Sequence, residues 1–215
     1  MTAAGPTVLL LASPLAPPSG RRDLHAALAA RGPVSAPAWS LSAASPDLLA
    51  GPTRQALAAL EDVDRPVVVC GLGSGAVLAL RVAAEAGPRV SGLVLTTGRT
   101  PSGPRLVRSL HRGVADLLPL AVLQRLHARD PQLLQTLDLV RPQDVDEPAA
   151  QVRQPAWVAW GTLDPLDRLT ARRLAAGLPA GTLVPVPDAR PGWVWAEPDR
   201  LAALVTALAA SVQGA

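Results

Sequence analysis

The chain has 215 residues, enough to bury one hydrophobic core, so we expect a single domain spanning 1–215. Its residues are 49% apolar, yet no apolar run reaches the roughly 20 residues that a membrane span needs, and the N-terminus lacks the basic region of a signal peptide. The net charge is only +3, and acidic residues are interleaved with the arginines, which argues against a nucleic-acid partner. These features predict a soluble, cytoplasmic protein that binds neither membrane nor nucleic acid.

The residues that most often bind metals are scarce. The single cysteine, Cys70, ends an apolar run, so we expect a buried strand residue and no disulfide. His25, His111 and His127 lie far apart in the sequence and show no metal-ligand spacing. The sequence predicts neither a metal nor a cofactor.

Short apolar runs alternate with longer helical stretches along the chain, which is typical of an α/β fold with a mostly parallel sheet flanked by helices. The predicted strands are 7–12, 33–37, 67–71, 90–96, 156–160 and 182–186. The predicted helices, bounded mainly by glycine and proline, are 20–31, 52–62, 74–86, 168–177 and 198–212.

Residues 99–150 break this alternation. They contain short leucine-rich pieces that are repeatedly interrupted by proline. We interpret the segment as a short helical cap inserted into the sheet domain.

The strongest motif follows the predicted strand at 67–71, where residues 71–75 read Gly-Leu-Gly-Ser-Gly and lead into an alanine-rich helix. This strand–turn–helix resembles the G-x-S-x-G nucleophile elbow of the α/β-hydrolase family. Gly71 and Gly75 match the small flanking residues of that motif. The nucleophile position holds Gly73.

The resemblance continues through most of the chain outside the cap, although the first hairpin common in the family is missing. Residues 155–166 are similar to the family strand that ends in G-x-x-D-P, so Asp164 matches the acid of the catalytic triad. Residues 186–193 match the loop that usually carries the histidine, whose position holds Pro191. The family's first well-kept strand normally ends in His-Gly and supplies an oxyanion-hole N–H. Here it ends in Ala12-Ser13.

These departures imply an α/β-hydrolase-like protein with a degenerate catalytic triad that has lost serine-hydrolase activity. Such a protein would bind a small hydrophobic metabolite, an acyl-type ligand or a protein partner. We expect the binding residues at the carboxyl edge of the sheet to be Ser13, Leu72, Gly73, Ser74, Trp193 and Trp195.

Ser74 and Asp164 keep an enzymatic alternative open. The activity would resemble that of an esterase or thioesterase, or that of a cyclase or isomerase. Ser74 is one position from the nucleophile site, and its other interpretation is a helix N-cap or an anion contact. Asp164 either caps the helix at 168–177 or holds its loop, or it is a lone general base. In the last case its pKa would be raised by a pocket lined with Trp193, Trp195 and Leu72.

A third hypothesis is NADP binding. The pattern Gly71-x-Gly73-x-x-Ala76 satisfies the dinucleotide fingerprint G-x-G-x-x-G/A. The acidic residue expected about 20 positions later is absent, although Arg99 is available for a 2′-phosphate.

The remaining tryptophans fit a structural role. Trp157 and Trp160 are three apart on one strand, which places them on opposite faces of the sheet within the core. Trp39 follows the strand at 33–37 and suits either core or ligand contact.

Overall fold

The computed structural model describes residues 6–14, 16–39, 47, 49–61, 63, 65–97 and 145–213. Six strands form one sheet in the order β2-β1-β3-β4-β5-β6, and every neighbouring pair is parallel. The strands are β1 (Val8–Ala12), β2 (Val34–Ser35), β3 (Val67–Leu72), β4 (Val90–Thr96), β5 (Ala156–Gly161) and β6 (Gly181–Val186). The predicted parallel α/β sheet is confirmed, although β2 is shorter than the predicted 33–37.

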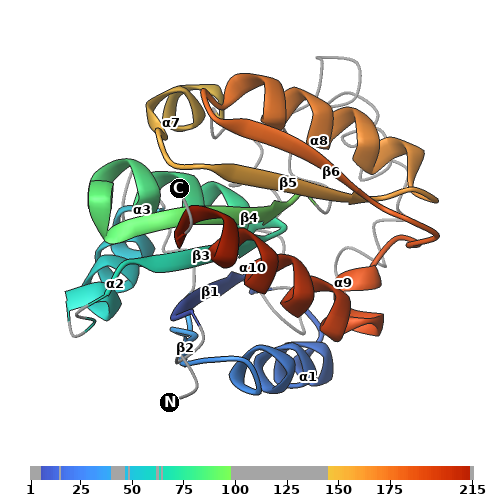
Figure 1. Ribbon diagram of the computed structural model, residues 1–215. Helices are drawn as coiled ribbons and strands as arrows, with labels where there is room; N and C mark the ends of the chain where they lie inside the picture. The colour runs from blue at the N-terminus through green and yellow to red at the C-terminus, as the bar shows by residue number, and fades with distance from the viewer. Residues whose placement is uncertain are drawn as a thin grey trace, which may run out of the picture.

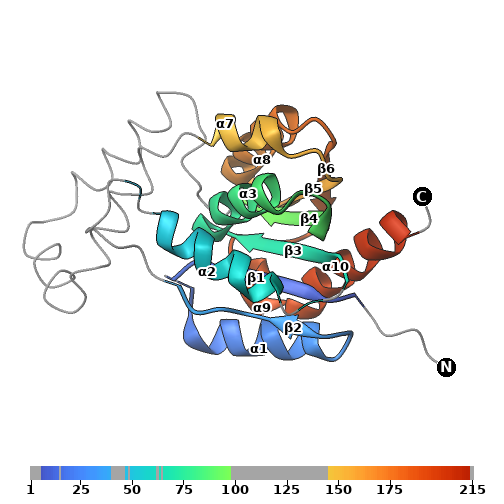
Figure 2. The same ribbon diagram turned by 90° about the vertical axis from the view of Figure 1, so that its left-hand side faces the viewer.

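Helices cover both faces of this sheet (Figure 1). They are α1 (Pro18–Ala29), α2 (Ala50–Glu61), α3 (Ser74–Ala86), α7 (Asp146–Gln151), α8 (Pro165–Gly177), α9 (Trp193–Ala196) and α10 (Pro198–Gln213), with a short 3-10 helix, η1 (Gly87–Arg89). Helices α1, α9 and α10 lie on one face, and α2, α3, α7 and α8 lie on the other (Figure 2). Among the described helices, none is long and apolar enough to cross a membrane.

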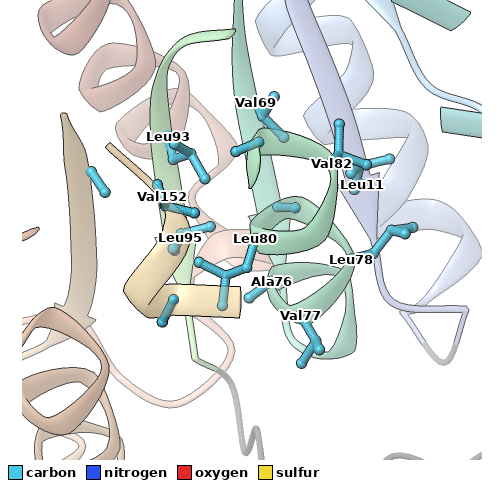
Figure 3. Packing of buried hydrophobic residues seen from close by; sticks show 14 of the residues in the cluster. Leu11, Val69, Ala76, Val77, Leu78, Leu80, Val82, Leu93, Leu95 and Val152 are labelled. Carbon is cyan, nitrogen blue, oxygen red and sulfur yellow. The ribbon is translucent and has the colours of Figure 1, made fainter. Parts of the chain in front are cut away.

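The two faces bury separate hydrophobic clusters because side chains alternate along each strand. In β3, Val67 and Val69 belong to the cluster under α3, whereas Val68 and Cys70 belong to the cluster under α1 and α10. Figure 3 shows the α3 side, where Val69 and side chains of β1 and β4 surround residues of α3. This double-sided burial explains why the strands are continuous apolar runs.

Cys70 is fully buried in β3, as predicted. Burial raises the pKa of its thiol to about 12, so it stays protonated at neutral pH. Trp157 and Trp160 lie on opposite faces of the sheet, since Trp160 belongs to one cluster and Trp157 packs against the other. That prediction is also confirmed.

The predicted cap at 99–150 lies largely outside the described residues. Its last residues form α7, which contacts α3 and α8. Val145 and Ala149 are buried in the same cluster as α3. This end of the predicted segment is therefore part of the main body.

Candidate functional site at the carboxyl edge of the sheet

The site lies where the order of the strands reverses. The chain passes from β1 outward to β2 and then returns past β1 to β3, so β1 and β3 flank a topological switch point. Open α/β sheets bind ligands at the carboxyl ends of such strands. Ser13 follows β1 and Gly73 follows β3 at this position.

Gly73 adopts the backbone conformation of a sharp strand-to-helix turn. Its φ is 61° and its ψ is −125°, a combination that glycine accepts far more readily than other residues. Its N–H donates to the carbonyl oxygen of Thr96 at 3.0 Å, and its own carbonyl accepts from the Ala76 N–H at 3.0 Å. The turn is held between the end of β4 and the first turn of α3.

The flanking glycines allow α3 to approach the sheet closely. A methyl group at Gly75 would lie 1.8 Å from the carbonyl oxygen of Leu11 in β1. A methyl group at Gly71 would lie 2.6 Å from the Cβ of Ala79 and 2.8 Å from the Cα of Ala76. The glycine pattern therefore has a packing explanation that needs no catalysis and no dinucleotide, and NADP binding stays a prediction.

Ser74 is the first residue of α3, and its hydroxyl donates to the Ser13 hydroxyl at 3.0 Å. The interpretation of Ser74 as the N-cap is wrong, because Gly73 holds that position and provides no side-chain cap. The structure instead joins Ser13 and Ser74, two of the predicted binding residues, across the switch point.

The loop from β1 to α1 offers little for an oxyanion. The Ser13 N–H donates to the Leu72 carbonyl at 3.0 Å, and the Ala16 N–H donates to the Ser13 carbonyl at 3.0 Å. Pro14 and Pro17 have no N–H. Every described residue of this loop therefore either uses its N–H internally or lacks one.

Asp164 begins α8. Its carboxylate accepts a hydrogen bond from the Asp167 N–H at 3.0 Å, which is the geometry of an N-cap. The capping interpretation is confirmed. The helix starts at Pro165, three residues before the predicted 168, because a proline directly after a capping aspartate suits the first helical position.

The structure adds Asp167 and Thr97, which the sequence analysis missed. The Thr97 hydroxyl donates to the Asp167 carboxylate, and Thr97 is fully buried at the end of β4. Burial raises the pKa of Asp167, the Thr97 hydrogen bond opposes this, and the negative charge of Asp164 raises the pKa further. Two features of the sequence could have indicated these residues. Asp167 follows the capping Asp164 by three residues, and Thr97 comes directly after a buried strand.

Pro191, at the position predicted from the resemblance to correspond to the histidine, is exposed in the loop after β6. This loop packs closely on β5. A methyl group added at Gly161 would lie only 2.5 Å from the carbonyl oxygen of Ala189. His25 lies on an exposed face of α1, and His111 and His127 lie outside the described residues. Among the described residues, no histidine lies in the loops that follow β1, β3, β5 or β6.

The other predicted binding residues are largely buried. Leu72 and Trp193 belong to the cluster under α1 and α10, with Leu72 fully buried and Trp193 only 4% exposed. Trp195 is half-buried and packs against Gly20 of α1. Their contacts are those of core residues, and their role as pocket walls stays a prediction.

Within the described part of the chain, no group of three or more histidine, cysteine, aspartate or glutamate residues is arranged to hold a metal ion. Arg99, the candidate for a 2′-phosphate contact, lies outside that part. Trp39 is buried in the cluster under α3, and it also lines a surface pocket beside α1.

No protein-family model matches the chain, and no curated protein sequence matches it. Solved structures do match over nearly its whole length. NosK from Streptomyces actuosus has a TM-score of 0.66 at 21% identity, covering 97% of this chain and 99% of its own. A monoacylglycerol lipase from Paleococcus ferrophilus has a TM-score of 0.60 at 15% identity, covering 95% and 96%.

A third structure is MGS-MChE2, an α/β-hydrolase enzyme from the metagenome of lagoon sediments at Mar Chica, Morocco. It has a TM-score of 0.60 at 19% identity, covering 94% of this chain and 89% of its own. These similarities agree with the mostly parallel sheet flanked by helices. The chain therefore has the α/β-hydrolase fold.

Proposed function

We propose that this protein has lost serine-hydrolase activity and binds a small hydrophobic metabolite or acyl-type ligand at the carboxyl edge of its sheet. The observation that carries the proposal is Gly73, which holds the conformation of a nucleophile elbow without a side chain to attack a substrate.

Two further features support the loss of hydrolysis. A serine hydroxyl needs a neighbouring base to remove its proton, and Pro191 stands where the fold places the histidine. An acyl-transfer site also needs N–H groups aimed at the developing oxyanion, and the described residues between β1 and α1 have none to spare. Among the described residues, the loops at this edge therefore offer Ser74 neither a histidine base nor a spare N–H between β1 and α1.

The binding role rests on what remains at the switch point. The Ser13 and Ser74 hydroxyls meet there, and the N-terminus of α3 lies directly behind them. Helix N-termini and hydroxyl groups suit a carboxylate or carbonyl oxygen of a ligand. A protein partner could bind at the same edge, and a binding experiment must distinguish it from a small molecule.

The proposal is tested by incubating the protein with a fluorophosphonate probe and with p-nitrophenyl esters of two to eight carbons. We expect no covalent label and no p-nitrophenol release above buffer, with Ser74→Ala indistinguishable from the natural chain. Covalent labelling at Ser74, located by peptide mass spectrometry, would overturn the proposal.

One observation favours a second candidate, an enzyme that moves protons without a serine nucleophile. Asp167 is a partly buried carboxyl group with a raised pKa at the carboxyl edge, and perturbed carboxyl groups are common in active sites. Such a group suits isomerisation or cyclisation of a hydrophobic carbonyl compound.

Proton abstraction is detected by incubating the protein in D₂O with a panel of hydrophobic ketones and thioesters and measuring deuterium uptake by mass spectrometry. Uptake that is lost in Asp167→Asn but kept in Asp199→Asn, an exposed carboxylate in the first turn of α10, would support this candidate. No uptake with any compound would remove it.

A further inference from the structure

The surface pocket beside α1 lies on the other side of β1 from the turn at Gly73. It has a volume of about 480 Å³ and lies between the first half of α1 and residues 36–39, which follow β2. Its apolar surface includes Leu10, Ala12 and Trp39. This volume falls within the range of small-molecule sites.

One face of α1 forms the polar wall. Pro18, Arg21, Arg22 and His25 all line the pocket, and their spacing of three, four and seven residues places them on a single helical stripe. The core-facing residues Leu24 and Leu28 lie on a different stripe. The basic groups are therefore gathered at the pocket while the helix is anchored by its other face.

Both walls are fixed by the fold. The pairing of Val8 with Val34 holds β2 against β1, and the Gln55 side chain donates to the Ala38 carbonyl at 2.7 Å. On the opposite side, Trp195 packs against Gly20 of α1. The pocket thus has a rigid frame, which lowers the cost of ordering a bound ligand.

The charge of the pocket is one-sided. No acidic residue is among those that line it. Within the described part of the chain, no ion pair joins Arg21, Arg22 or His25 to a carboxylate, and the first turn of α1 contains no acidic residue. The positive end of the α1 dipole adds to the basic side chains.

From this arrangement we infer that the pocket binds a small anionic amphiphile, whose carboxylate or phosphate contacts Arg21 and Arg22 and whose apolar body lies on Leu10, Ala12 and Trp39. Guanidinium groups match carboxylate and phosphate oxygens with paired hydrogen bonds. An apolar floor beside a basic edge discriminates against both simple anions and neutral lipids. This site goes beyond the proposed function, because it requires nothing from Gly73 or Ser74.

The inference is tested by isothermal titration calorimetry with octanoate, and with octyl phosphate to compare the two headgroups. We expect saturable binding of one or both, with 1-octanol, octylamine and acetate binding at least roughly tenfold more weakly because each lacks the anion or the apolar body. The double variant Arg21→Gln/Arg22→Gln is expected to weaken binding at least roughly tenfold.

The matched control is Arg31→Gln/Arg54→Gln, which removes two positive charges at exposed positions outside the pocket. It is expected to retain the affinity of the natural chain, and circular dichroism checks that both double variants are folded. Equal binding of 1-octanol and octanoate, an equal loss in both double variants, or no binding of either anion would overturn the inference. Covalent labelling of Ser74 would remove the proposed function but leave the octanoate isotherm unchanged, so the two failures are distinguishable.

Discussion

The turn after β3 and the loops after β1 and β6 lie at the same edge of the sheet, yet they differ in what they keep of an α/β-hydrolase. The β3–α3 turn has glycine at both flanks and a positive φ at Gly73. The loop after β1 has no spare N–H among its described residues, and the loop after β6 has Pro191 at the predicted histidine position.

The difference separates what the fold requires from what the chemistry requires. Helix α3 crosses β1 and β3 so closely that only glycine fits at residues 71 and 75. This packing does not depend on a nucleophile, a base or an oxyanion hole. Packing alone therefore explains the glycines that flank this turn, whether or not catalytic groups accompany it.

The largest expected effect is at Gly75. In Gly75→Ala the new methyl group meets the Leu11 carbonyl at 1.8 Å, and backbone atoms must move to relieve the contact. We expect the free energy of unfolding, measured by urea denaturation, to fall by about 3 kcal/mol or more.

The matched control is Gly51→Ala in α2, where a methyl group meets nothing within 4 Å. It is expected to raise stability by about 0.5 to 1 kcal/mol through helix propensity. If Gly75→Ala is as stable as the natural chain, close packing is not the reason for the glycine.

Gly73→Ser tests whether geometry alone restores chemistry. The added Cβ has to adopt the positive φ of 61°, so we expect a loss of about 1 to 2 kcal/mol in unfolding free energy. We also expect no esterase activity, because the described residues of these loops supply neither a histidine base nor a spare N–H between β1 and α1. Gly73→Ala is the control and should lose the same stability.

A burst of p-nitrophenol from Gly73→Ser, followed by a covalent serine adduct, would contradict this prediction. It would mean that a base and an oxyanion donor exist at the site. The proposed loss of hydrolase chemistry at this turn would then be wrong.

Periodicity and glycine pattern were sufficient to predict the sheet, most helices and the turn at Gly73, because these depend on neighbours close in sequence or on continuous apolar runs. The Asp164 cap was predictable for the same reason. The Thr97–Asp167 contact was not, since it joins residues 70 positions apart and depends on how the end of β4 faces α8.

The surroundings of Trp193 and Trp195 were also beyond prediction from the sequence. Both were expected to line a pocket because they lie in a loop at the carboxyl edge of the sheet, where open α/β sheets bind ligands. The structure begins the short helix α9 after Gly192, whose φ is 80°, a backbone feature that the pattern of apolar residues does not predict. Trp193 enters the core and Trp195 packs against α1.

A smaller effect is expected at Asp164. Asp164→Ala removes the side-chain acceptor for the Asp167 N–H, which should cost about 1 kcal/mol of stability by loss of the N-cap. Asp164→Asn keeps an acceptor and is expected to retain most of that stability. If both variants lose the same amount in urea denaturation, the negative charge matters more than the cap.

The smallest effect concerns the pH dependence set by Asp167. Its pKa in the folded chain is raised above the ordinary 3.8, so the folded state holds the proton at pH values where the unfolded chain has lost it. The stabilisation by Asp167 is therefore complete at pH values below its pKa in the unfolded chain. It declines as the pH rises through its pKa in the folded chain. Asp167→Asn removes this decline, so the variant should gain stability relative to the natural chain as the pH rises from about 3 to 7.

The measurement is a series of urea unfolding curves across that pH range, with Asp199→Asn as the control in the first turn of α10. The difference between Asp167→Asn and the natural chain should be larger at pH 7 than at pH 3, and larger than the corresponding change in the control. Parallel pH profiles for the two variants would mean that the buried setting of Asp167 has no energetic consequence. In that case the Asp167 carboxyl group would behave like the exposed carboxyl group of Asp199, and the second candidate function would lose its support.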